Sequence, residues 1–101
     1  MADAAGFVAM GCAEVLIHTE DIAATIGDGY RGPDDLTDRV TRRLFPWAPQ
    51  HADPWQRFRW CTGRAALPDH PRQGEDWWWH CEPLSEWDGG PRIRTAPPGW
   101  R

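Results

Sequence analysis

The sequence predicts a mainly α-helical protein in which about three helices are followed by an irregular segment rich in tryptophan and proline. Residues 6–26 form a long apolar run without proline, and apolar residues recur at helical spacing over residues 33–46. From residue 67 onward, closely spaced prolines and glycines exclude another long helix. We therefore expect a helical unit over residues 1–66. Over residues 67–101 we expect an irregular segment that packs on the helices, with at most one or two short strands and a loose tail.

The first helix is expected to begin near Asp3 and to end at Gly27, a residue type that suits a helix C-terminus. It is apolar around most of its circumference, and one side consists of Val8, Val15, Ile22 and Ile26. A helix that is apolar all round is typically buried. Such a helix needs neighbours on several sides, and we expect the rest of the chain to supply too few of them.

The second helix should start at Pro33 and its two following aspartates, because proline fits the first turn and acidic residues favour the positive end of the helix dipole. Pro46 should end it. Its apolar stripe, at i, i+4 and i+8, consists of Leu36, Val40 and Leu44.

A short third helix is expected after Asp53, with Trp55 and Phe58 on one side, and should run to about Thr62 with Gly63 as its stop. After it, only residues 76–81 could form a strand.

The eight tryptophans of the chain have two interpretations, ring stacking on sugars or bases and coverage of the apolar helices. We expect coverage, and on the possible strand we expect Trp77 and Trp79 to share one face. Trp55 and Trp60 should cover the helices in the same way.

Composition limits the function classes. The chain has 101 residues and a net charge of −4, which argues against binding to nucleic acid or to an anionic membrane surface. It has no run of about 18 apolar residues that could span a membrane. The three cysteines lack CxxC spacing, so we expect neither a disulfide framework nor a structural zinc site. All 11 basic residues are arginine, a bias typical of a GC-rich genome, and we expect a soluble bacterial cytoplasmic protein.

Glu14 and His18 are the main candidates for chemistry. At about 100° per residue they project about 40° apart, so their side chains can meet at one point. We expect the pair on or beside the packing face, away from a solvated back marked by Glu20. A divalent metal suits both residue types, whereas the simpler interpretation is a hydrogen bond on the helix surface. The neighbours on the same face are Phe7, Gly11, Val15 and Ile22.

Three parts of the chain carry a resemblance to a known family. They are MGCAEVLIHTEDIA at 10–23, the Pro-Asp-Asp-Leu start of the second helix, and WCTGRAALP at 60–68, followed by the Trp-rich end. Together they resemble the mycothiol-dependent maleylpyruvate isomerase-like family of DinB-like metal-binding helical bundles, over residues from about 6 to 88. The resemblance implies that the three helices are part of such a bundle.

The resemblance also implies a divalent metal, most often zinc, held by two histidines and a glutamate, with an open position for water or a thiolate. Glu14 and His18 match the second and third ligands, and the first is a histidine on an earlier helix. The chain thus resembles the C-terminal portion of a longer family member, truncated and with an incomplete metal site. An active member would use mycothiol, a small-molecule thiol, on a carboxylate substrate, converting maleylpyruvate to fumarylpyruvate. The alternative is a non-catalytic helical remnant or interaction module in which the pair is structural.

Other candidate residues each keep two interpretations. Asp21 could orient the imidazole or be an exposed acid, and Arg64 could bind a substrate carboxylate or form structural contacts. His51 and His70 are expected to be exposed loop residues, and His80 to pack against aromatic rings. Because the first helix lacks enough neighbours, we also expect some self-association.

Overall fold

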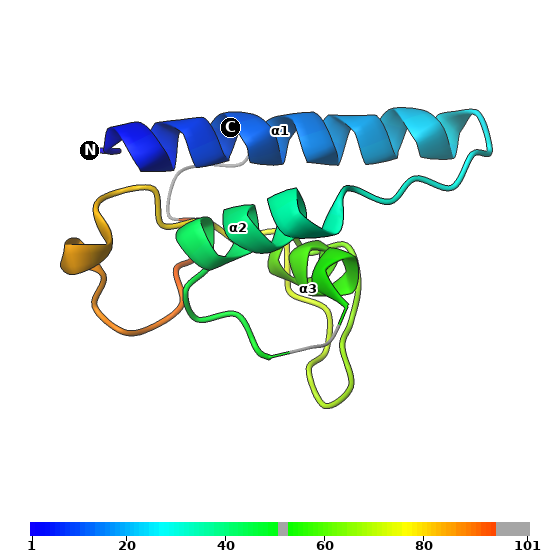
Figure 1. Cartoon of the computed structure of the whole chain (residues 1–101). Helices are drawn as coiled ribbons and strands as arrows, with labels where there is room; N and C mark the ends of the chain where they lie inside the picture. The colour runs from blue at the N-terminus through cyan, green and yellow to red at the C-terminus, as the bar shows by residue number, and fades with distance from the viewer. Residues whose placement is uncertain (51–52, 95–101) are drawn as a thin grey trace.

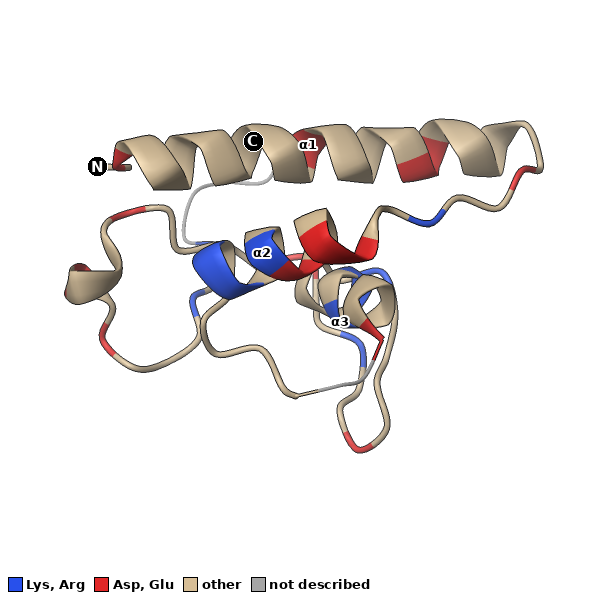
Figure 2. Ribbon diagram, viewed as in Figure 1, with Lys and Arg blue, Asp and Glu red and all other residues tan. Residues whose placement is uncertain are grey.

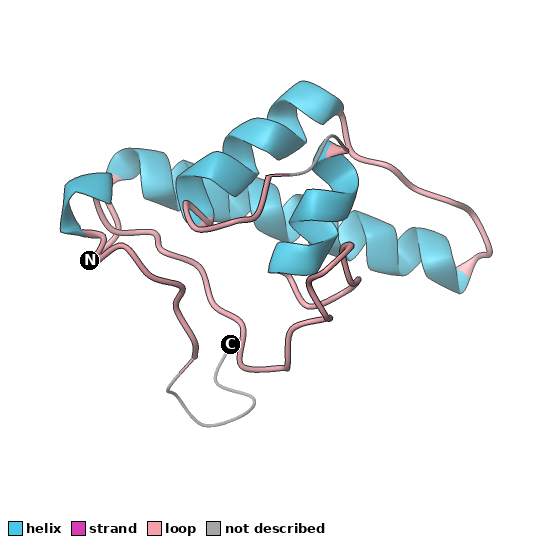
Figure 3. Cartoon of the chain, turned by 90° about the horizontal axis from the view of Figure 1, so that it is seen from below, coloured by secondary structure: helices cyan, strands magenta, loops and turns pink. Residues whose placement is uncertain are grey.

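The computed structural model describes residues 1–50 and 53–94 and is mainly helical, as the sequence predicts. Its helices are α1 (Ala4–Thr25), α2 (Asp34–Leu44), α3 (Pro54–Cys61) and the short 3-10 helix η1 (Leu84–Glu86). The long α1 lies on one side of α2 and α3 (Figure 1), and Figure 3 shows the helices from below, with loops on either side of η1 in the described chain after α3.

The ends of α1 follow from its sequence. Asp3 caps the start, because its carboxylate accepts a hydrogen bond from the backbone amide of Gly6 at 2.7 Å. At the other end Gly27 adopts a positive φ of 75°, and the amide of Asp28 donates back to the carbonyl of Ala23 at 2.8 Å. This is a Schellman ending, for which glycine is the favoured residue.

Within residues 1–50 and 53–94, α1 buries one face only. That face carries Ala9, Ala13, Leu16 and Ile17, which are at most 7% exposed and pack toward α2 and the core. The opposite side is 63–74% exposed at Val8, Val15, Ile22 and Ile26. This agrees with the expectation that the rest of the chain supplies too few neighbours for this helix, because the other described helices all gather on one side of α1.

In α2 the buried stripe is rotated from the predicted one. Val40 and Leu44 are buried as expected, but Leu36 is 37% exposed and the two threonines Thr37 and Thr41 are buried instead. The Thr41 hydroxyl donates to the backbone carbonyl of Thr37 at 2.9 Å, so a polar group is placed in the core with a partner.

The third helix begins and ends as predicted. The Asp53 side chain accepts from the amide of Trp55 at 3.0 Å, and Gly63 adopts a φ of 70° after the last turn. Trp55 and Phe58 are buried and their rings stack with centroids 5.5 Å apart.

After α3 the described chain contains two isolated bridges and no strand. Trp77 and Trp79 are buried against the helical core, at 7% and 5% exposure, which confirms their predicted role as cover. One bridge joins Trp77 to Ile93, and the amide of His80 donates to the carbonyl of Leu44 at 2.8 Å. Among the described residues, the chain offers no helix of sufficient length and apolarity to pass through a membrane.

Candidate functional site

Glu14 and His18 meet on α1, as their spacing predicts. Nε2 of His18 lies 3.0 Å from Oε2 of Glu14, a hydrogen-bond distance. Both side chains are accessible, with exposures of 67% for His18 and 38% for Glu14. The pair therefore presents a nitrogen and an oxygen donor at one point on an open surface.

The exposure of the pair reverses the predicted orientation of α1. Glu20, expected to mark the solvated back, has only 16% of its side chain exposed and faces the protein body. Its carboxylate lies 2.9 Å from Nε of Arg59 and 3.4 Å from Nε of Arg64. Arg59 of α3 and Arg64, which follows α3, stabilise Glu20 on the packing face. The Glu14–His18 pair consequently faces outward.

Asp21 and Arg64 form an ion pair with each other. Nη2 of Arg64 donates to both carboxylate oxygens of Asp21, at 3.0 and 3.3 Å. Arg64 also donates to the carbonyl of Thr62 at 3.3 Å. The structure thus favours the structural interpretation of Arg64, and it places Asp21 with this arginine and not with the imidazole of His18.

The remaining histidines do not join the pair. His70 is exposed, as predicted, and its ring lies edge-on to Trp60 with centroids 5.8 Å apart. His51 lies outside the described residues. Among residues 1–50 and 53–94, no group of three or more His, Cys, Asp or Glu side chains could hold a metal ion. The described residues thus add no third candidate ligand beside Glu14 and His18, whereas a zinc site in a protein has at least three protein ligands.

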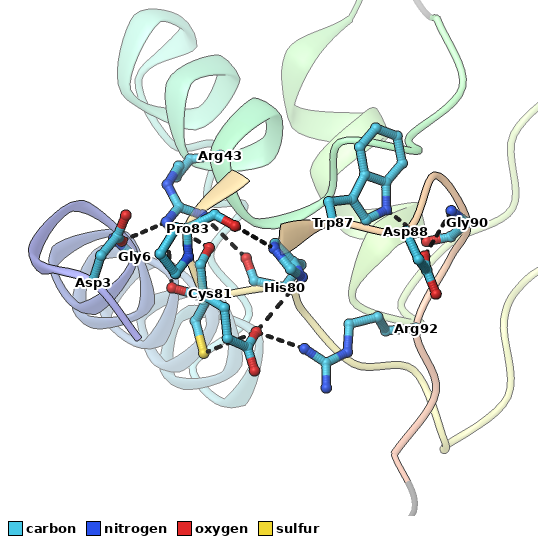
Figure 4. Close-up of polar contacts among 11 residues, drawn as sticks. Asp3, Gly6, Arg43, His80, Cys81, Pro83, Trp87, Asp88, Gly90 and Arg92 are labelled. Atoms are coloured by element: carbon cyan, nitrogen blue, oxygen red, sulfur yellow. Dashed lines mark hydrogen bonds and ion pairs between the residues drawn. The ribbon is translucent and has the colours of Figure 1, made fainter. Parts of the chain in front are cut away.

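A second polar cluster, which sequence reasoning missed, surrounds Arg43 and His80 (Figure 4). Arg43 extends from α2 to the carboxylate of Asp3, and it also donates to the carbonyls of His80, Cys81 and Glu82 at 3.2, 3.3 and 2.9 Å. Its side chain is only 14% exposed. These contacts join the start of α1, the end of α2 and the C-terminal segment.

His80 is buried at 4% exposure, and its Nε2 lies 3.1 Å from the carbonyl oxygen of Pro83. Its Nδ1 is 3.6 Å from Glu82, and that carboxylate receives a 2.6 Å contact from Arg92. Burial raises the pKa of Glu82, but the hydrogen bond and charge of Arg92 outweigh it and hold this pKa at about 2. A shallow cavity of about 270 Å³ lies beside these residues and is lined by His80, Glu82, Glu86, Asp88 and Arg92.

These contacts explain the cluster without a ligand. The carboxylate of Glu82 is neutralised by Arg92, and the His80 ring is fixed by the Pro83 carbonyl. The cluster therefore serves to hold the C-terminal segment on the helices. No local spacing in the sequence indicates this cluster, because the carbonyl contacts of Arg43 are with residues 37–39 positions away.

Comparison of this chain with protein-family models, with curated proteins and with solved structures found no match. The arrangement of Glu14 and His18 on α1 is therefore the feature from which a function has to be argued.

Proposed function

We propose that Glu14 and His18 supply two ligands of a divalent metal site, with zinc as the expected metal, whose remaining ligands come from outside the described chain. The observation that carries the proposal is the 3.0 Å approach of Nε2 of His18 to Oε2 of Glu14 on an accessible face. Imidazole nitrogen and carboxylate oxygen are both normal zinc donors. The resemblance to mycothiol-dependent maleylpyruvate isomerase-like proteins supports the same two residues.

The setting of the pair also supports this proposal. Alpha1 carries no arginine or lysine, so no cation on this helix competes with a metal for the Glu14 carboxylate. Figure 2 shows α1 with acidic turns and no basic ones, whereas the basic residues lie on the other elements. Asp21, the nearest further acid along this side of α1, is already held by Arg64.

A site completed by one or two further ligands would keep a position open for a small molecule. A metal bound there lowers the pKa of a coordinated thiol or water and polarises a substrate oxygen. In that setting Glu14 and His18 would fix the metal, and a thiol-dependent isomerase or transferase would be the class of enzyme implied. Mycothiol and a carboxylate substrate remain part of this proposal through the resemblance alone.

The alternative function is a non-catalytic interaction module. The exposure of the pair favours it, because an i, i+4 hydrogen bond on a helix surface contributes only about 0.2–0.5 kcal/mol and needs no ligand. The exposed apolar side of α1 favours it as well, since such a surface is typical of an interaction site.

Zinc titration by calorimetry separates the two functions. We expect the purified protein to bind zinc with a dissociation constant well below about 1 mM, a free energy stronger than about −4 kcal/mol. His18→Ala should abolish this binding, and Glu14→Gln should weaken it at least tenfold.

The matched control is His70→Ala, which removes another exposed histidine far along the chain from the pair. It should bind zinc like the unchanged protein. Binding no tighter than millimolar, or binding that His18→Ala leaves unaltered, would exclude a metal role for the pair in this protein by itself and favour the interaction module.

A further inference from the structure

The exposed side of α1 carries several large apolar side chains. Five of its side chains are 63–74% exposed, and together they present on the order of 500 Å² of apolar area, as much as the largest patch on a typical monomer. They are Phe7, Val8, Val15, Ile22 and Ile26. The surface continues onto α2 at Leu36, across apolar hollows of about 490 and 570 Å³ that share Val8, Cys12 and Leu36.

Two pairs of residues on this side of α1 are placed symmetrically about the middle of the helix. Phe7 and Ile22 lie equally far from the midpoint between Glu14 and Val15, and so do Gly11 and His18. If a second α1 lay antiparallel in this register, Phe7 would meet Ile22 of the other copy. Gly11, which has no neighbouring atom within 4 Å of the position of a Cβ, would leave room for the larger His18.

The same symmetry brings the polar pairs together. A two-fold axis perpendicular to two antiparallel helices keeps corresponding residues on the same edge of the seam. The centre of the Glu14–His18 pair is 1.5 residues from the midpoint, so the two centres would lie about 4–5 Å apart along the helix axis at 1.5 Å per residue. The two Glu14 residues would themselves be one residue, or about 1.5 Å, apart along the axis; carboxylates this close repel each other, and a cation between them removes the repulsion.

We propose that the exposed side of α1 binds α1 of a second copy of this chain in antiparallel register, and that the two Glu14–His18 pairs form one metal site of four ligands. Two copies would bury on the order of 1,000 Å² from the five side chains alone, close to the lower limit for a specific interface. The packing of α1 against α1 needs no metal. The four-ligand site rests on the proposed function, and the experiment separates the two.

Sedimentation velocity without zinc tests the surface. The protein should pass from monomer to dimer as its concentration rises from 1 to 200 µM, an interval chosen to span a moderate affinity of about 10 µM. Val15→Glu should weaken the dimer at least tenfold without changing the far-UV circular dichroism. Leu84→Glu, a control at an exposed apolar residue of η1, should leave it unchanged. A protein that stays monomeric throughout, or a dimer insensitive to Val15→Glu, overturns the proposal.

Disulfide trapping tests the register, in a background with Cys12 and Cys81 replaced by serine. Val15→Cys should cross-link to itself, because the two copies of residue 15 would be only one residue apart along the axis. Val8→Cys should not, because its two copies would be 13 residues or about 20 Å apart, beyond the reach of a disulfide. Equal cross-linking at both positions would indicate a parallel pair and refute the register.

Zinc then tests the shared site. One zinc should bind per two chains and strengthen the dimer at least tenfold, and His18→Ala should dimerise without responding to zinc. A dimer that zinc does not strengthen retains the surface but refutes the four-ligand site. If one zinc binds per monomer, the Glu14–His18 pair binds metal as proposed, but the two pairs of the dimer do not share one site.

Discussion

Arg43 is expected to be the residue on which the attachment of the C-terminal segment depends most. Replacing it with methionine keeps the aliphatic stem but removes the guanidinium that contacts the Asp3 carboxylate and the carbonyls of His80, Cys81 and Glu82. Hydrogen bonds from a charged donor contribute about 1.5–3 kcal/mol each. The 2.9 Å hydrogen bond to the Glu82 carbonyl should contribute this full amount, and the two longer hydrogen bonds should contribute less. Removing a largely buried charge also removes its desolvation cost, which offsets part of the lost stability.

On this basis Arg43→Met should reduce the free energy of unfolding by about 2–3 kcal/mol, a large share of the about 5–10 kcal/mol that a domain of this size holds. Urea titration followed by tryptophan fluorescence measures the change, since Trp77, Trp78 and Trp79 directly precede His80. Hydrogen exchange should quicken at the amide of His80, which donates to Leu44 only while the segment is docked.

Arg42→Met provides the matched control. Arg42 is the preceding residue, but its side chain is 65% exposed and pairs with Asp38 at the surface. Such a pair contributes between about 0 and 1 kcal/mol. If Arg43→Met destabilised the protein no more than Arg42→Met, the reasoning that assigns the attachment to Arg43 would be refuted.

Two further predictions concern the same region. Gly6→Ala should destabilise the protein by about 2 kcal/mol or more in urea titration, because the new Cβ would lie 1.8 Å from the carbonyl oxygen of Cys81. The control is Gly11→Ala, whose Cβ would have no atom within 4 Å. It should stabilise the dilute monomer by about 0.5–1 kcal/mol. A Gly6→Ala variant as stable as the unchanged protein would contradict the close approach at Gly6. The low pKa of Glu82 means that its contribution to stability is complete above its unfolded value near 4.5 and is lost as pH falls toward about 2. Glu82→Gln should therefore lower the melting temperature at pH 6 and much less at pH 2.5, and an equal effect at both values would count against the ion pair with Arg92.

The helices could be predicted from the sequence because their signals are local. The capping side chain of Asp3, the positive φ of Gly27 and the Asp53 cap of α3 each depend on residues within a few positions. The i, i+4 meeting of Glu14 and His18 could be predicted for the same reason.

The orientation of α1 could not be predicted in this way. The helix is apolar on both sides, so periodicity alone does not distinguish the packed side from the open one. The orientation depends on residues distant in sequence. Arg59 and Arg64 bind Glu20, so the side of α1 that carries Glu20 packs against the other helices and the side that carries His18 does not. The Arg43 cluster was missed for the same reason, because its acceptors are carbonyls 37–39 residues away.

Because Glu14 and His18 are exposed, metal binding by this pair is coupled to the binding of whatever covers the exposed side of α1. Two ligands on an open helix face leave most of a zinc ion hydrated, and such a site is weak. Any element that covers this face and contributes ligands must bind more tightly when the metal is present, because the metal stabilises the state that holds it. The reverse also holds, since the two binding free energies are linked. A metal role for the pair therefore predicts that zinc and the occupant of the α1 surface strengthen each other, whereas a purely structural pair predicts that they act independently.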